Sequence, residues 1–224
     1  MMKILVTGSG AGLGLAIALA LSASGHEVIP YDIKDGDDVG FPSSKLALIN
    51  DLDGLINCAG INCNEWFEDI APESLQRVMD VNAFSMVYMT QAVLRPLVRA
   101  KGFVLNIVSN AASMPMTSSL AYNASKAAAL MITRQMAHEL TKKHGLTVFS
   151  ISPNKLSGTE MSKQIEDNVV ATRGWTREYA AEYQRQSLMH GLETPPSAIA
   201  AYIVHLLDSG NWKYMSGTDI PFGK

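Results

Sequence analysis

The chain has 224 residues, a length typical of one α/β domain, and 47% of them are hydrophobic, which supports a buried core and argues against disorder. The net charge of −3, with no basic block, argues against nucleic-acid binding. We expect no leader, since the first residues lead directly into a predicted strand; there is no membrane-length apolar run, and Cys58 and Cys63 match no zinc spacing. We therefore expect a cytoplasmic protein with no membrane segment and no metal site.

The first feature along the chain is a glycine-rich turn between a strand and a helix. Residues 3–7 are apolar and β-branched, which is typical of a buried parallel strand, and residues 13–23 favour a helix. Such a junction directs free backbone N–H groups and the positive end of a helix toward one point, so it favours a dinucleotide pyrophosphate over an ordinary turn. The expected cofactor-binding residues here are Gly8, Ser9, Gly10, Ala11, Gly12, Leu13 and Gly14.

The second predicted strand, residues 27–31, ends at Asp32. A carboxylate at this spacing accepts hydrogen bonds from an adenosine ribose and repels a 2′-phosphate, which favours NAD(H) over NADP(H). Lys34 is close enough to leave NADP(H) open, and an ordinary turn aspartate is the alternative interpretation. We expect Asp38 and Val39 to end a short third strand near the adenine, followed by a short helix at residues 43–50.

The middle of the chain places small and polar residues at the expected site. The predicted strand at residues 53–57 ends at Asn57 and runs into Ala59 and Gly60, which let the backbone approach a ligand. Residues 72–99 read as one long helix. Asn82 lies on its apolar face, where a buried amide is either a structural bridge or part of a site.

The remaining elements keep strands and helices alternating. Strands are expected at residues 103–108, 146–151 and 218–222, and helices at 122–144, 160–167, 176–189 and 195–207. This order predicts an α/β fold with a doubly wound, Rossmann-like parallel sheet flanked by helices on both faces, in a single domain over residues 1–224.

Three side chains at the carboxyl edge of this sheet suit proton transfer. Tyr122 and Lys126 are one helical turn apart, and a nearby ammonium lowers the pKa of a phenol toward useful values. Ser109 ends the strand at residues 103–108, and its hydroxyl can polarise a carbonyl for hydride attack. Each residue alone has an ordinary structural explanation, whereas the combination behind a glycine-rich turn is much more specific.

These motifs resemble those of the short-chain dehydrogenases/reductases (SDR), single-domain enzymes that use NAD(P)(H), over nearly the whole chain. Residues 7–14 are similar to the family's cofactor loop, residues 57–60 to its Asn-Asn-Ala-Gly motif with Cys58 replacing an Asn, and residues 122–126 to its Tyr-x-x-x-Lys signature. The resemblance implies a catalytic tetrad of Asn82, Ser109, Tyr122 and Lys126.

The resemblance also implies the role of each residue. Tyr122 is the acid/base, Ser109 orients the substrate oxygen, Lys126 binds the nicotinamide ribose, and Asn82 holds a water in a proton relay. Pro153 and Thr159 are expected near the nicotinamide. Two departures affect that region, because Asn154 replaces the usual glycine after Pro153 and Thr159 is about one position late.

The resemblance further predicts a substrate lid at residues 156–195 and a homodimer or homotetramer built on the two long helices. The expected function is NAD(P)(H)-dependent oxidoreduction between a secondary alcohol and a ketone, of which 3-oxoacyl-thioester reduction is one example. The expected partner is therefore a small-molecule alcohol or carbonyl compound. The alternative is a non-catalytic dinucleotide-binding regulatory or scaffold protein of the same fold, which would not need all four tetrad residues.

Overall fold

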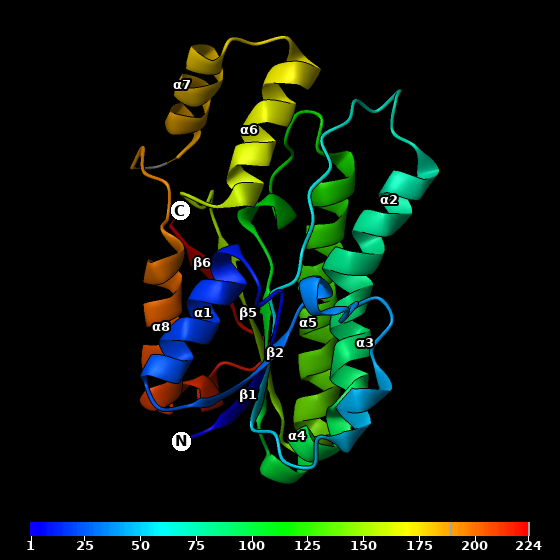
Figure 1. Cartoon of the computed structure of the whole chain (residues 1–224), viewed down its shortest axis with the longest axis vertical. Coiled ribbons are helices and arrows are strands. Elements are labelled where there is room, and N and C mark those ends of the chain that lie inside the picture. Colours follow the sequence, from blue (N-terminus) through cyan, green and yellow to red (C-terminus); the bar gives the residue numbers. More distant parts are fainter. Residues whose placement is uncertain (189, 224) are drawn as a thin grey trace.

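The protein is built on one parallel sheet of six strands in the order β2-β1-β3-β4-β5-β6 (Figure 1). This computed structural model describes residues 1–188 and 190–223. The strands are β1 (Lys3–Thr7), β2 (Glu27–Tyr31), β3 (Gly54–Asn57), β4 (Phe103–Ile107), β5 (Thr147–Pro153) and β6 (Asp219–Phe222). Because the strands are parallel, the residues that follow β1 to β5 meet at one edge, where such sheets bind ligands.

Helices cover both faces of the sheet (Figure 1). One face carries α1 (Gly12–Ala23) and α8 (Pro196–Asp208), and the other carries α2 (Pro72–Met79), α3 (Ser85–Ala92), α4 (Leu94–Ala100) and α5 (Leu120–His144). Two further helices, α6 (Glu160–Arg173) and α7 (Arg177–Ser187), stand beyond the carboxyl edge. The doubly wound α/β architecture expected from the sequence is confirmed.

Apolar residues of the strands explain this layering. β3, β4 and β5 are buried along their whole length, which accounts for their continuous apolar runs. On one face the core joins Ile17 of α1 to Ile203 of α8, and on the other it joins Met89 of α3 to Ala137 of α5. The sheet edge that bears the candidate site is therefore held rigidly from both sides.

The prediction of a short third strand that ends at Asp38 and Val39 is wrong. The described chain there forms two short 3₁₀ helices, at Ile33–Asp35 and Ser44–Leu48, so β2 is the edge of the sheet. The buried Tyr31 holds this connection in place, since its hydroxyl donates to the carbonyl of Asp38 (3.3 Å) and accepts from the amide of Ser43 (3.0 Å). Val39 packs into the core beside Tyr31.

The prediction of a single long helix at residues 72–99 is also wrong, because this segment is divided into three helices. A π-helical turn at Asp80–Phe84 separates α2 from α3, and the helix breaks again at Val93. Pro96 has no N–H to donate to the carbonyl of Ala92, which accounts for the second break. The predicted helix at residues 176–189 corresponds to α7, and its last residue, Met189, lies outside the described residues.

Candidate active site at the carboxyl edge of the sheet

The turn between β1 and α1 needs glycine at several positions. Gly8 has a φ of +66°, and a Cβ there would lie 2.8 Å from Cα of Ala59. A Cβ on Gly14 would lie 2.1 Å from the carbonyl oxygen of Gly8. Within the described residues no side chain caps α1, so the first amides of the helix are left for another acceptor. These features fit a dinucleotide pyrophosphate, whose oxygens are the acceptors that such a cradle binds.

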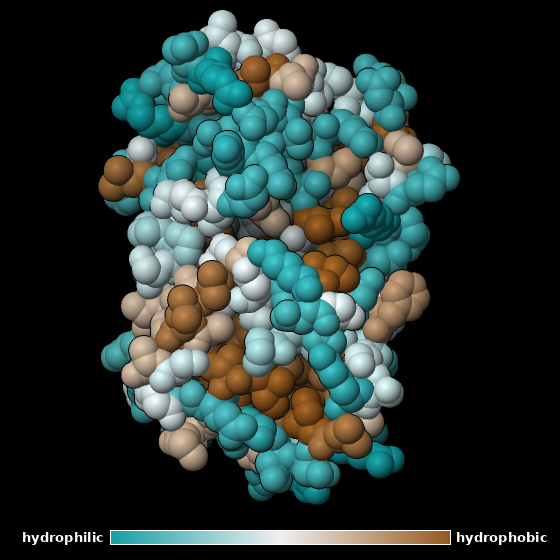
Figure 2. Space-filling view, viewed as in Figure 1, coloured by the Kyte–Doolittle hydropathy of each residue, from teal (hydrophilic) through white to brown (hydrophobic). Residues whose placement is uncertain are grey.

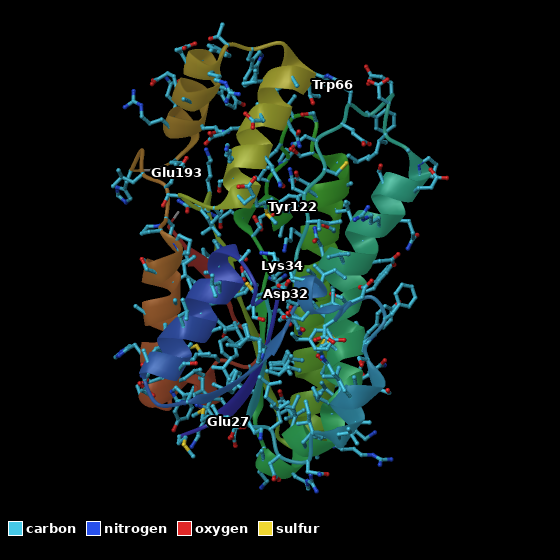
Figure 3. The ribbon with its side chains drawn as sticks, viewed as in Figure 1. Glu27, Asp32, Lys34, Trp66, Tyr122 and Glu193 are labelled. Carbon is cyan, nitrogen blue, oxygen red and sulfur yellow. The ribbon has the colours of Figure 1, made fainter. Side chains whose placement is uncertain are left out.

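Asp32 lies directly against this turn. Its carboxylate accepts hydrogen bonds from the amides of Gly10 (2.8 Å) and Lys34 (3.0 Å), and the residue is only 7% exposed. The ammonium of Lys34 donates a hydrogen bond to the carbonyl of Gly10 at 3.1 Å. Each carboxylate oxygen keeps a second lone pair, so Asp32 can still accept from a ribose hydroxyl. Asp32 and Lys34 thus place opposite charges beside the glycine turn (Figure 3).

Residues 57–60 form the next wall of the site. The hydroxyl of Thr7 accepts hydrogen bonds from the amides of Cys58 (3.0 Å) and Ala59 (3.1 Å), which ties the end of β3 to the end of β1. Asn57 is buried and donates to Asn106 of β4 at 2.8 Å. Its side-chain oxygen has no partner among the described residues, so Asn57 supports the sheet edge and still offers one acceptor.

Tyr122 and Lys126 lie together on α5, as their spacing predicts. The ammonium of Lys126 is 5.7 Å from the centre of the Tyr122 ring and donates to the carbonyl of Ile107 at 3.2 Å. Burial lowers the pKa of Lys126 to about 8, and the Cys58 thiol opposes this decrease. A Cβ on Gly60 would lie 3.8 Å from this ammonium, so the small residue leaves Lys126 room at the site.

The side chains of Ser109 and Tyr122 lie close enough to interact, and the Ser109 hydroxyl also accepts a hydrogen bond from the amide of Ala111 at 3.1 Å. Burial raises the pKa of Tyr122 above its ordinary value, and the interaction with Ser109 opposes the increase. The sequence predicted the reverse direction, with Lys126 lowering the pKa. The difference arises because burial destabilises the phenolate by more than the interactions with neighbouring groups stabilise it.

Asn82 is fully buried within the π-helical turn, where its side chain binds the chain after β3. Its oxygen accepts from the amide of Ile61 (2.8 Å), and its nitrogen donates to the carbonyl of Ile61 (2.9 Å) and to the hydroxyl of Ser125 (3.0 Å). Asn82 therefore braces residues 60–61 against α5. Ser125 was missed as a site residue, although it lies inside the Tyr122–Lys126 motif.

Thr159 and Pro153 lie at the base of the lid. A Cβ on Gly12 would lie 3.7 Å from the methyl carbon of Thr159, so the threonine is next to the glycine turn. Thr159 also caps α6 by accepting from the amide of Ser162 at 3.0 Å. Pro153 ends β5 beside Phe222 of β6.

The Asn154 side chain contacts the end of the lid and the last residues of the chain. It accepts from the hydroxyl of Thr194 at 2.6 Å and donates to the carbonyl of Gly223. The carboxylate of Asp38 accepts a hydrogen bond from the nearby amide of Gly40 at 2.8 Å.

Two further observations come from the described part of the chain. No helix in residues 1–188 or 190–223 is both long and apolar enough to span a membrane. The same residues contain no cluster of three or more His, Cys, Asp or Glu side chains that could hold a metal ion.

Comparison with known proteins identifies the family. The model of the short chain dehydrogenase family matches residues 42–169, and the chain belongs to this family. A short chain dehydrogenase family protein from Francisella tularensis subsp. tularensis SCHU S4 has a similar structure, with a TM-score of 0.83 at 25% identity, over 99% of this chain and 96% of that one. The resemblance seen in the sequence motifs is therefore confirmed.

Two relatives with named activities share parts of the chain. The NADPH-dependent 1-acyldihydroxyacetone phosphate reductase of Schizosaccharomyces pombe is 32% identical over 144 residues, which cover 63% of this chain and 48% of the relative. The sorbitol-6-phosphate 2-dehydrogenase of Klebsiella pneumoniae is 28% identical over 187 residues, which cover 77% of this chain and 69% of the relative. The chain thus spans about half the length of the first relative and just over two thirds of the second.

Proposed function

We propose that this chain is an NAD(P)(H)-dependent oxidoreductase that interconverts secondary alcohols and ketones. The observation that carries the proposal is the Lys126 ammonium 5.7 Å from the centre of the Tyr122 ring, with Ser109 next to Tyr122 and a glycine cradle at the same sheet edge. A bound nicotinamide supplies or accepts the hydride. A non-catalytic binding protein would have no chemical need for this arrangement, so we favour the enzyme.

In the proposed mechanism Tyr122 moves the proton. In reduction its hydroxyl donates to the oxygen of the substrate carbonyl, and in oxidation the phenolate accepts the proton of the alcohol. Ser109 donates a hydrogen bond to the same oxygen as charge develops on it. The Lys126 ammonium stabilises the phenolate and is placed to bind the nicotinamide ribose. Asn82 maintains the position of residues 60–61, and a water held near it would connect Lys126 to solvent.

The proposed cofactor cradle consists of residues 8–14 with Asp38 and Val39 toward the adenine. Toward the nicotinamide it is completed by Asn57, Ala59, Gly60, Tyr122, Lys126, Pro153 and Thr159. NAD(H) is the preferred form in this proposal, because the buried Asp32 carboxylate would repel a 2′-phosphate. Lys34 lies next to Asp32 and offsets part of that repulsion. We therefore expect NADP(H) to bind more weakly than NAD(H) but still to be used by the enzyme.

The proposed substrate is a small alcohol or carbonyl compound, a class that includes 3-oxoacyl thioesters. The relatives act on polyol and keto compounds by their names, among them sorbitol 6-phosphate and 1-acyldihydroxyacetone phosphate. Residues 156–195 serve as the substrate lid of a single catalytic domain that spans residues 1–224. The outer face of α6 and α7 is mainly hydrophilic (Figure 2), as expected for a lid that faces water.

We further propose a cytoplasmic homodimer or homotetramer. Tyr88 of α3 and Met131 of α5 are 39% and 60% exposed, which supports pairing through these helices. Light scattering should give two or four times the monomer mass of 24.2 kDa, and a monomeric mass would refute the proposal.

A panel of ketones and secondary alcohols tests the function directly. The protein is mixed with each compound and with NADH, NADPH, NAD⁺ or NADP⁺, and nicotinamide absorbance is followed. Turnover of at least one compound, faster with NAD(H) than with NADP(H), is the expected result. Binding of the dinucleotide without turnover of any compound would favour the non-catalytic alternative.

A further inference from the structure

The helices α6 and α7 form one body on a short stem. Residues 154–157 lie beside residues 192–194, with hydrogen bonds from the amide of Thr194 to Lys155 (2.9 Å) and from the amide of Ser157 to Thr194 (3.0 Å). The Lys155 ammonium binds Glu166 of α6 and Glu193 of the stem, both at 2.6 Å, and Gln184 of α7. Because one partly buried cation joins all three segments, α6 and α7 are expected to move together.

The far end of α6 is attached to the opposite side of the site. The indole N–H of Trp66 donates to the carbonyl of Thr172 at 2.9 Å, and Figure 3 shows Trp66 beside this end of α6. The guanidinium of Arg173 donates to the hydroxyl of Ser118 at 3.3 Å and to the carbonyl of Thr117. Thus α6 extends from the glycine turn, where Thr159 begins it, across to the loop before α5.

This attachment reaches the residues that come just before Tyr122. Residues 117–119 immediately precede α5, and Tyr122 lies in the first turn of that helix. Ser118 is buried with a φ of +52°, a left-handed conformation that costs energy for a residue other than glycine. Two contacts hold it, since its hydroxyl accepts from Arg173 and its carbonyl accepts from the amide of Glu65 at 3.0 Å.

We propose that Arg173 is a positioning residue that couples closure of the α6–α7 lid to the orientation of Tyr122. This inference rests on the proposed function. With Arg173 bound to residues 117–118, the lid is closed and the first turn of α5 is held in one orientation. When the guanidinium leaves, the lid opens at this end, and Ser118 is free to relax its backbone and shift that turn.

Hydrogen exchange and kinetics test the inference together. Arg173→Met removes the guanidinium, Arg173→Lys keeps a cation, and Trp66→Phe removes only the N–H donor of the second attachment. The matched control is Arg177→Met, which breaks an exposed ion pair with Asp167 inside the lid and leaves the attachment to residues 117–118 intact. Amide exchange is measured in peptides from α6 and from residues 115–124.

Arg173→Met should speed exchange about tenfold in both peptides, because one charged hydrogen-bonding group is lost from a partly exposed site. The same variant should lower kcat as well as raise KM, with partial recovery in Arg173→Lys and no change in Arg177→Met. Trp66→Phe should speed exchange in α6 and raise KM, with a smaller effect on residues 115–124.

Two failures are distinguishable. Unchanged exchange in residues 115–124 of Arg173→Met, or a higher KM with unchanged kcat, would overturn the coupling, since Arg173 would then only anchor the lid. The absence of turnover in the wild-type chain would overturn the proposed function instead, and the exchange data would still decide whether the lid and the first turn of α5 are linked.

Discussion

Replacing Asp32 with Asn should shift cofactor use toward NADP(H). The substitution keeps the size of the side chain, and one of its two hydrogen bonds to the amides of Gly10 and Lys34 can be retained. What it removes is a negative charge that is only 7% exposed and lies against the glycine turn. A 2′-phosphate bound at this turn would no longer meet that charge.

The size of the effect follows from the position of the carboxylate. Two unit charges about 4 Å apart interact by about 1 kcal/mol in water and about 4 kcal/mol at a protein surface of intermediate dielectric. Asp32 is nearly buried, and the Lys34 ammonium partly offsets its charge, so a change of about 1–3 kcal/mol is expected. That energy corresponds to a shift of roughly 5- to 150-fold.

The assay is the ratio of kcat/KM with NADPH to kcat/KM with NADH, measured on one substrate. The ratio should rise by that factor in Asp32→Asn and fall in Lys34→Met. Asp35→Asn is the control, because it removes an exposed carboxylate three residues further along and leaves the glycine turn untouched. If Asp32→Asn and Asp35→Asn gave the same ratio as wild type, Asp32 would not select the cofactor.

Three more predictions concern stability. Gly8→Ala should lower the free energy of unfolding in urea by about 2 kcal/mol or more and weaken NADH binding, because the added Cβ would overlap Ala59 at a φ of +66°. A free energy of unfolding equal to that of the wild type would mean that the turn accommodates the methyl group. Asn82→Ala should lower the free energy of unfolding by about 2–4 kcal/mol, since the amide and the carbonyl of Ile61 both lose their hydrogen-bond partner. A decrease of less than about 1 kcal/mol would contradict the proposal that Asn82 holds residues 60–61 in place. Between about pH 8 and 9 the free energy of unfolding of the wild type should rise by about 1 kcal/mol relative to that of Lys126→Met, because Lys126 loses its proton near pH 8 when folded and keeps it to a higher pH when unfolded; parallel pH curves for the two proteins would contradict this.

The upper limit of that pH window has its own cause. Burial raises the pKa of Cys58 to about 12 and that of Cys63 to about 11, so near pH 9 and above the folded chain retains two thiol protons that the unfolded chain loses. These two thiols lower the free energy of unfolding as the pH rises toward 9 and beyond, and so offset the contribution of Lys126. The net rise is therefore confined to the interval just above pH 8.

Local patterns were enough to predict most of the framework. The continuous apolar runs at residues 3–7 and 103–107 mark strands buried on both faces, and the glycines at residues 8–14 mark a turn whose neighbours leave no room for a Cβ. The close approach of Tyr122 and Lys126 followed from helical spacing alone. These features depend on residues near one another in the chain.

The expectations that were wrong depend on distant contacts. The connection after β2 lacks the expected strand because the Tyr31 hydroxyl holds residues 38–43 in another path. The direction of the Tyr122 pKa could not be predicted, since burial by other segments determines it. The attachment of Arg173 to residues 117–118 joins segments more than fifty residues apart, and no periodic pattern indicates it.

The central claim is that Tyr122 transfers the proton at a site that also binds a dinucleotide. Tyr122→Phe keeps the ring and removes only the hydroxyl, so the most direct measurement compares this variant with wild type in NADH titration and in nicotinamide absorbance under turnover. We expect an unchanged Kd for NADH and a loss of kcat of at least about a hundredfold. Turnover within a few-fold of wild type, with the same Kd, would contradict it.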